Sequence, residues 1–195
     1  MKCLGQGAVP TAGNSKELTD KGLKLYAIEK ALIIYDVADQ PNYTLVVLFD
    51  RFGWRQVTME HGEKLYYGLK TKVNTKEIID GETTFTMNLR EKKGKVRVNK
   101  DLSQLAGYKS PDEIFIAQMA KIKANKTGTE NILDKECEVW EYESRGKKLK
   151  IWSWHGVPLK HISTSGTQTA LSINLNPEIN ELVFVPPADV QLVME

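Results

Sequence analysis

The most constraining feature of the sequence is the stretch SPDE at residues 110–113, which carries a complete helix-start signature. It places a capping serine first, proline at the first helical position, acids in the first turn and a glutamate three residues after the serine. Lysines then lead to Gly128, where we expect the helix to end. The stretch predicts one amphipathic helix, buried on one side. Its apolar stripe consists of Phe115, Ile116, Met119, Ala120 and Ile122.

Short runs typical of β-strands lie both before and after this helix. Strands on both sides of a single helix exclude the alternating pattern of parallel α/β folds. Turn residues at close spacing, such as those at 61–63 and 80–81, indicate antiparallel pairing. The basic stretch 90–100 is either a patch for phosphate or a solvated segment, and we favour the solvated segment because no aromatic residue is interleaved for base stacking. The predicted strands cover about residues 25–37, 44–49, 54–60, 65–73, 77–79, 83–89, 136–143, 148–154, 161–166, 169–175 and 181–185.

The number of predicted strands constrains how the single helix can be packed. One helix of about four turns cannot cover a flat sheet of roughly ten strands. We therefore expect a mostly β (α+β) fold, in which a curved antiparallel sheet forms an open half-barrel wrapped around one main helix. This arrangement leaves a concave apolar groove beside the helix, which suits an acyl chain.

The composition indicates one soluble domain with balanced charge. A length of 195 residues with 41% hydrophobic residues supports one core, and 27 Lys and Arg against 25 Asp and Glu give no reason to expect a nucleic-acid or anionic-membrane partner. No apolar run approaches the roughly 18 to 20 residues that span a bilayer. Residues 1–22 are rich in Gly, Pro, Ser and Thr, so we expect a flexible tether followed by a single domain over 23–195.

No group of residues in the sequence is typical of a catalytic or metal site. The three histidines are His61, His155 and His161, and their spacing matches no common zinc pattern. Ser153 lies in no G-x-S-x-G elbow, and two flanking glutamates disfavour the thiolate of Cys137. We therefore expect a protein that is not an enzyme and that has no metal or cofactor.

The aromatic residues are the best candidates for a functional role. Trp152 and Trp154 point to the same face of their strand, as do Trp140 and Tyr142 on the strand before it. If the two strands form a hairpin, the four rings can line one patch. That patch either fills the core or lines the mouth of the groove. With two side chains of the helix added, the candidate ligand-binding residues are Trp140, Tyr142, Trp152, Trp154, Phe115 and Met119.

Several stretches of the chain together resemble a known group of proteins. They are LYAIEKALIIYDV (25–37), LFDRFGWRQVTME (48–60), EIIDGETTF (77–85), ILDKECEVWEYE (132–143), KIWSWHGVPLKH (150–161) and ELVFVPP (181–187). These stretches resemble envelope proteins of Bacteroidetes type, which are in turn similar to the LolA/LolB-like superfamily of periplasmic carriers and outer-membrane acceptors of lipoproteins. The order of elements fits this superfamily over about residues 23–190. Its fold is an unclosed antiparallel barrel with a helical lid.

The resemblance implies a place in the periplasm or at the outer-membrane periphery, and it also puts Cys3 at or near a lipidated N-terminal cysteine. Two functions follow. In the first, a non-enzymatic envelope protein, associated with the outer membrane, holds a lipid or a lipoprotein acyl chain in the concave groove. In the second, an envelope sensor or scaffold binds another protein through the same sheet. Under both we expect a monomer without a nucleic-acid partner.

Overall fold

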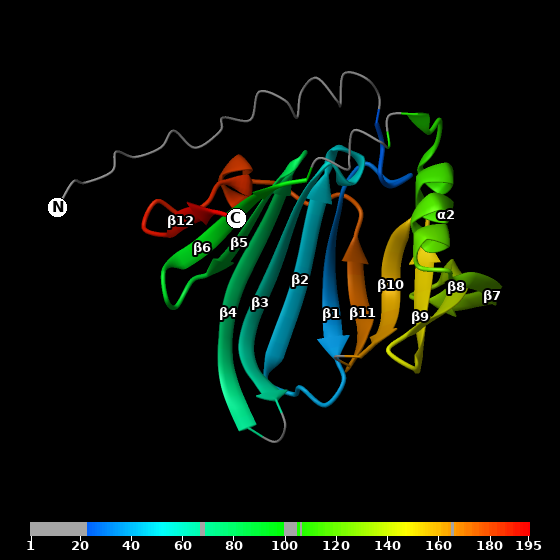
Figure 1. The fold of residues 1–195 in the computed structure, drawn as a ribbon, viewed down its shortest axis with the longest axis horizontal. Coiled ribbons are helices and arrows are strands. Elements are labelled where there is room, and N and C mark those ends of the chain that lie inside the picture. The colour runs from blue at the N-terminus through cyan, green and yellow to red at the C-terminus, as the bar shows by residue number, and fades with distance from the viewer. Residues whose placement is uncertain (1–22, 67–68, 100–104, 106, 165) are drawn as a thin grey trace.

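The computed structural model describes residues 23–66, 69–99, 105, 107–164 and 166–195. The predicted tether at 1–22, including Cys3, lies outside the described residues. Within the described part, twelve strands form one sheet in the order β12-β6-β5-β4-β3-β2-β1-β11-β10-β9-β8-β7, and the two end strands do not pair (Figure 1). The first six strands are β1 (Ala31–Val37), β2 (Tyr43–Asp50), β3 (Arg55–Tyr66), β4 (Leu69–Asp80), β5 (Thr83–Asn88) and β6 (Lys93–Val98). The others are β7 (Asn125–Ile132), β8 (Lys135–Ser144), β9 (Lys147–Trp154), β10 (Val157–Ser163), β11 (Gly166–Asn174) and β12 (Gln191–Met194).

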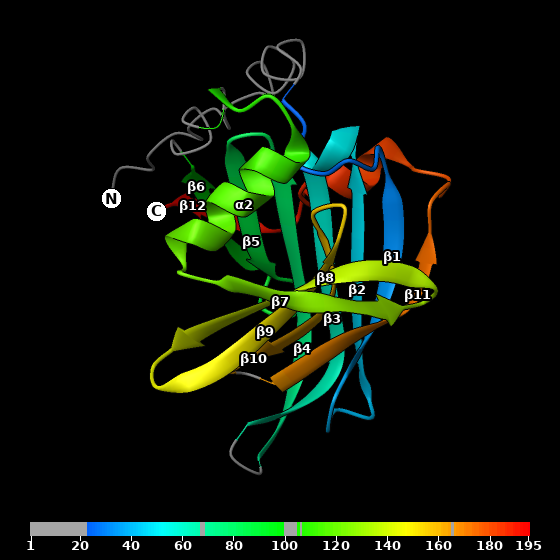
Figure 2. The same ribbon diagram turned by 90° about the vertical axis from the view of Figure 1, so that its right-hand side faces the viewer.

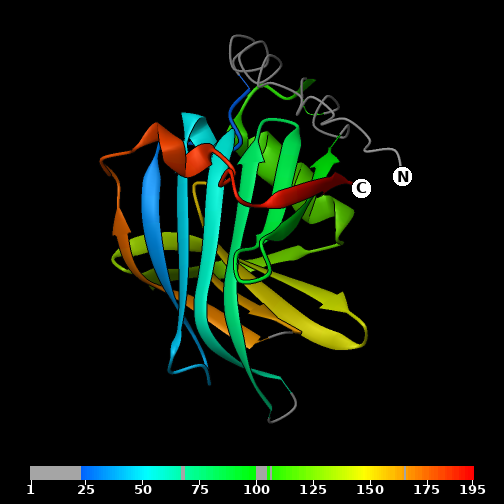
Figure 3. The ribbon, with the colours of Figure 1, turned by 90° about the vertical axis from the view of Figure 1, so that its left-hand side faces the viewer.

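The described strands confirm the prediction of a mostly β fold built on one open sheet, with one α-helix, α2 (Pro111–Lys121). All neighbouring strands are antiparallel except β12, which runs parallel to β6. The sheet curls strongly, so that β7 to β10 cross in front of β1 to β4 (Figure 2). The C-terminal segment that holds the 3-10 helix η3 (Glu181–Phe184) crosses the opposite face (Figure 3).

The helix α2 begins where the sequence predicts but ends earlier. The side chain of Ser110 accepts a hydrogen bond of 3.2 Å from the backbone N–H of Glu113, as its cap signature requires. The predicted end at Gly128 is wrong, because residues 125–132 form β7 and pair with β8. The predicted stripe is also too wide, since the Ile116 side chain is 53% exposed. The helix buries Ile114, Phe115 and Met119.

Several predictions about the strands differ from the structure, and for residues 25–30 the cause is a contact between distant segments. Residues 25–30 are not part of β1, since the backbone N–H groups of Leu25 and Tyr26 both donate to the carbonyl oxygen of Phe52 at 2.9 Å. Residues 90–100 contain β6, and the predicted strand at 181–185 is the 3-10 helix η3.

The predicted turn at residues 61–63 lies inside the long strand β3. Gly62 has a φ of +125°, and a Cβ atom there would lie 1.9 Å from the carbonyl oxygen of Asn42. Only glycine fits this position, so Gly62 serves the close approach of the β1–β2 connection rather than a turn.

The sheet buries its two faces in different places. We call inner the face of β1 and β2 that carries Ile33 and Leu45, and outer the opposite face. The inner face packs against β8, β9 and β10 in the largest core cluster, which includes Phe49, Trp152 and Leu159 and has no buried member from α2. The outer face of β2 to β6 forms a second cluster, covered by the C-terminal segment. Its buried members are Leu48, Val57, Ile78, Phe85, Met87, Val96 and Phe184.

The helix contributes to a third and smaller cluster, in which Ile114 packs with Leu23, Trp54 and Leu105. Sheet packed on sheet therefore supplies most of the core, and α2 adds to it at one side.

Candidate ligand-binding pocket

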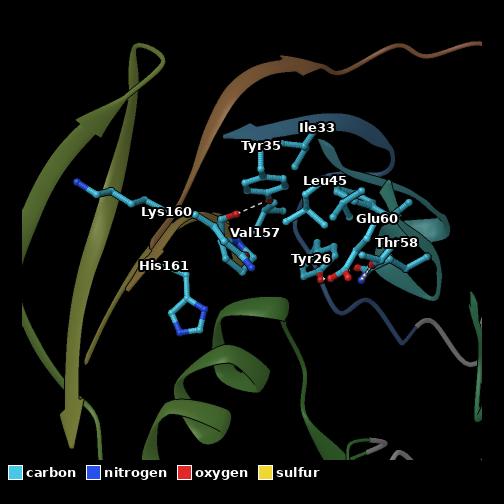
Figure 4. Close-up of a pocket in the computed structure, with 14 residues that line it drawn as sticks. Tyr26, Ile33, Tyr35, Leu45, Thr58, Glu60, Val157, Lys160 and His161 are labelled. Atoms are coloured by element: carbon cyan, nitrogen blue, oxygen red, sulfur yellow. Dashed lines mark hydrogen bonds between the residues drawn. The ribbon is translucent and has the colours of Figure 1, made fainter. Parts of the chain in front are cut away.

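A pocket of about 240 Å³ opens on the inner face of the sheet, and we call it the concave pocket (Figure 4). Strands β1, β2 and β3 form one wall, and β10 and β11 form the other. The pocket therefore exists only because the sheet curls. Its lining residues are Tyr26, Ile33, Tyr35, Leu45, Val47, Phe49, Gln56, Thr58, Glu60, Val157, Pro158, Lys160, His161 and Gln168.

The deep part of the concave pocket is apolar. Alternate residues of a strand share a face, and β2 sends Leu45, Val47 and Phe49 inward while Ile33 of β1 lies opposite Val47. Val157 of β10 adds apolar surface from the opposite wall. The wall offers branched aliphatic and aromatic surface, which suits contact with a hydrocarbon group.

Two tyrosine hydroxyls in the pocket are already engaged within the protein. Tyr26 donates to Oε1 of Gln56 at 3.1 Å, and Tyr35 donates to the carbonyl oxygen of Pro158 at 2.6 Å. Burial raises the pKa of Tyr26 to about 12 and also raises the pKa of Tyr35. Both rings therefore stay neutral at pH 7 and present carbon surface to the pocket.

The third strand gives the concave pocket a polar side. Gln56, Thr58 and Glu60 lie across from the apolar residues of β2. The hydroxyl of Thr75 donates to Glu60 at 3.3 Å, and Nζ of Lys64 lies 3.7 Å from the same carboxylate. The pocket is therefore amphipathic, with a hydrocarbon wall next to a polar one.

The basic residues at the pocket's far wall are turned to other partners. Nζ of Lys160 lies 4.6 Å from the ring centre of Trp152, and Figure 4 shows this side chain extending away from the tyrosines. Nε2 of His161 and the hydroxyl of Tyr142 share a hydrogen bond of 3.0 Å, and burial lowers the pKa of His161. Neither side chain therefore offers a free positive charge inside the pocket.

The four predicted aromatic rings do not form one patch. In the β8–β9 hairpin, Val139 pairs with Trp152, whereas Trp140 pairs with Ile151. Paired residues share a face, so Trp152 lies on the face opposite Trp140. The hypothesis of a single patch is wrong because the register of the hairpin, which alternation within each strand does not specify, offsets the two pairs by one residue.

The six candidate residues lie outside the lining of the concave pocket. Trp152 is 3% exposed and donates from Nε1 to Glu130 at 2.8 Å, so it fills the core. Trp140 donates from Nε1 to Glu138 at 3.1 Å and meets Phe115 edge-on, with 5.8 Å between ring centres. Met119 is buried on α2.

Two of the six, Phe115 and Trp154, line a separate pocket of about 490 Å³ between α2 and the strands β8 and β9, which we call the helix pocket. Asp112, Glu136 and Glu138 also line it. These three carboxylates make its surroundings acidic and therefore unfavourable for an anionic lipid.

Three residues that line the concave pocket were not predicted from the sequence, although they alternate regularly along their strands. They are Tyr35, Leu45 and Phe49. That alternation identifies an inner face, but it does not show where the curl leaves that face uncovered. The alternation therefore predicts which residues form the apolar wall, but it does not predict that a pocket opens beside them.

The described residues contain no group of three or more His, Cys, Asp or Glu side chains that could hold a metal ion. Cys137 is fully buried, and this burial raises the pKa of its thiol to about 11. None of the helices in the described ranges is long and apolar enough to cross a bilayer.

Comparisons with known proteins show the fold alone. No family model matches the sequence, and no curated protein matches it. An uncharacterised conserved protein from Thermus thermophilus superposes with a TM-score of 0.54 at 10% identity, covering 93% of this chain and 99% of that one. The structure of PNGF-II gives a TM-score of 0.51 at 11% identity over 86% of this chain and 31% of its own.

The Pseudomonas aeruginosa MucA/MucB complex gives a TM-score of 0.49 at 11% identity, covering 93% of this chain and 64% of the matched one. At this TM-score the likeness supports no inference about function.

Proposed function

We propose that this chain is a non-enzymatic binding protein of the cell envelope, periplasmic or at the outer-membrane periphery, that takes the apolar end of a lipid or acyl chain into the concave pocket. The envelope location and the LolA-like, Bacteroidetes-type affinity rest on the resemblance of the sequence stretches given above. The ligand class rests on the pocket.

The observation that carries the proposal is the hydrocarbon wall formed by Ile33, Leu45, Val47, Phe49 and Val157 beside an opening on the inner face. Among the described residues no side chain fills this space, although the inner face of β1 beside it is buried. A pocket that keeps apolar surface open favours an apolar ligand.

The volume restricts what can enter. At about 240 Å³ the concave pocket is slightly smaller than the roughly 300–1,000 Å³ typical of sites that enclose a whole small molecule. We therefore expect it to enclose the end of a chain, with the remainder lying along the inner face.

The experiment fills the pocket from β2 and measures binding of a fluorescent fatty acid. Val47→Phe adds a ring inside the pocket, and Thr44→Phe adds the same ring on the opposite, exposed face of the same strand. We expect Val47→Phe to weaken binding by about tenfold or more, which corresponds to about 1.4 kcal/mol, and Thr44→Phe to leave it unchanged. Circular dichroism checks that both variants fold, since overpacking costs about 1–3 kcal/mol.

A third variant, Trp154→Ala, enlarges only the helix pocket. Binding that is lost in this variant and kept in Val47→Phe would move the site to the helix pocket. A wild-type protein that neither binds the fatty acid nor carries a lipid in native mass spectrometry would refute the proposal.

The exposed edge strand β7 favours a second candidate, an envelope sensor or scaffold that binds another protein. This strand ends the sheet, and its residues from Asn125 to Asn131 are exposed. An open edge can accept an extended peptide as an additional strand. Native mass spectrometry separates the candidates, because a purified scaffold would carry no lipid and Val47→Phe would leave its protein binding intact.

A further inference from the structure

The inner face continues without interruption from the concave pocket across β4 and β5 to β6 (Figure 1). The pairings between β2 and β6 contain no bulge, so cross-strand partners stay on one face. One such row runs from Val47 through Thr58, Glu77 and Thr86 to Lys95. The pocket and the inner side of β6 therefore belong to one surface.

The chemistry of this surface changes steadily along the rows. It is apolar on β2, and on β3 to β5 it is made largely of Thr, Gln, Asn and Glu side chains. On β6 it becomes cationic, because Lys93, Lys95 and Arg97 all point inward and are exposed, whereas Val96 points to the outer core. A ligand lying along a row would meet hydrocarbon, then hydrogen-bonding groups, then positive charge.

Side-chain hydrogen bonds between the strands support this shared face. Thr75 donates to Glu60 at 3.3 Å, and Thr86 donates to Glu77 at 3.4 Å. These contacts engage the carboxylate of Glu60, which lines the pocket, and that of Glu77, which lies between the pocket and β6.

The charges of β6 are only partly neutralised. Nζ of Lys95 pairs with Glu195 at 3.0 Å, with both side chains more than half exposed. Lys93 and Arg97 form no salt bridge within the described ranges, so they offer two cations to an anionic group. An Arg and a Lys on one exposed strand face are well suited to a phosphate or carboxylate.

We infer that the inner face takes a single-chain amphiphile with an anionic head, its apolar end in the concave pocket and its head at Lys93, Lys95 and Arg97. The four strand spacings from β2 to β6 put these regions about 19 Å apart, at roughly 4.8 Å for each spacing. This inference rests on the proposed function and names the ligand class of the same site. Charge complementarity at β6 excludes a cationic head.

The test compares hexadecyl phosphate with hexadecanol, which has the same chain and no charge, by titration calorimetry. We expect the wild-type protein to bind hexadecyl phosphate about tenfold more tightly. The double variant Lys93→Gln with Arg97→Gln should lose this preference and still bind hexadecanol. The control, Lys147→Gln with Lys148→Gln, removes the same charge from two exposed residues of β9 and should keep the preference.

A further variant tests the path along the row. Glu77 lies between the pocket and Lys95, so Glu77→Gln removes a repulsive charge beside an anionic ligand. We expect tighter binding of hexadecyl phosphate and unchanged binding of hexadecanol. A merely structural role of Glu77 would alter both ligands alike.

The outcomes separate the two levels of the proposal. Equal affinity for hexadecyl phosphate and hexadecanol would overturn this inference and leave the proposed function standing. Failure to bind either ligand would overturn both. Inorganic phosphate that binds as tightly as hexadecyl phosphate would show that β6 takes a free anion, and it would overturn the amphiphile.

Discussion

The two halves of the sheet bury opposite faces, and β2 is the strand at which they meet. Leu45 and Phe49 of β2 point into the inner core with β1 and β8 to β10, whereas Leu48 points into the outer core with β3 to β6. A strand that is buried on both faces carries a nearly continuous apolar run, and the sequence TLVVLF shows this run.

The two cores are also closed by different means. The inner core closes because the sheet folds back on itself, whereas the outer core is covered by a C-terminal segment of mostly irregular structure. Within the described residues the C-terminal segment covers only the outer face, whereas the inner face of β3 to β6 carries mainly polar side chains. This difference explains why the concave pocket opens at the boundary between the two halves.

The largest expected effects come from removing one buried side chain from each core. Phe49→Ala should cost about 3–5 kcal/mol and Ile78→Ala about 2–5 kcal/mol, since each deletes a fully buried side chain. Because β2 belongs to both cores, we expect each variant to unfold in one transition that is the same by tryptophan fluorescence and by circular dichroism. Urea denaturation measures both quantities.

Two separate transitions, or a variant that loses only one of the two signals, would contradict this prediction. It would mean that the halves are independent folding units rather than one.

A smaller effect is expected from the charged cluster that fastens the C-terminal segment to the outer core. Arg55 is buried, binds Asp50 and Glu181, and stacks on Phe184 at 4.2 Å. Burial alone lowers the pKa of Arg55, but the hydrogen bonds to these two carboxylates outweigh burial and raise this pKa overall. Arg55→Met should lower the free energy of unfolding by about 2–3 kcal/mol. This loss is smaller than that from breaking a wholly buried ion pair, because the Glu181 side chain is 71% exposed.

Hydrogen exchange provides the specific readout for this cluster, since amides of Glu181–Phe184 should exchange faster in Arg55→Met. The control Lys92→Met removes an exposed ion pair with Asp189 in the same segment and should change nothing measurable. Equal protection of the segment in wild type and Arg55→Met would show that apolar contacts alone hold it.

The smallest expected effect is a pH dependence of stability that arises from His161 in the inner half of the sheet. Burial lowers the pKa of His161 below its ordinary 6.5, so the folded protein binds fewer protons there than the unfolded chain. Stability should therefore fall as pH drops below about 6.5, and this part of the slope should disappear in His161→Gln. Denaturation at about pH 7.5 and about pH 5.5 tests it, and identical slopes in both proteins would contradict it.

The features that the sequence predicted correctly all have local causes. The helix start at Ser110 depends on one side chain and the backbone of the next turn, and both lie within four residues. The mostly β class of the described residues follows from the short alternating runs on both sides of that signature. The six candidate residues do not line the concave pocket, whereas Phe115 and Trp154 line the helix pocket, so their role in binding stays a prediction.

What only the tertiary structure decided depends on contacts between distant residues. The register of β8 against β9 puts Trp140 and Trp152 on opposite faces of the sheet. The backbone of Asn42 approaches Gly62 closely, at a position that lies inside β3 and not in the predicted turn. A shift of one residue moves a side chain to the other face, and nothing local specifies that shift. The sequence by itself therefore determined the start of α2, most of the strands and which of their faces are apolar. The curl of the sheet decided which apolar face stays open, because curvature results from the packing of all strands together.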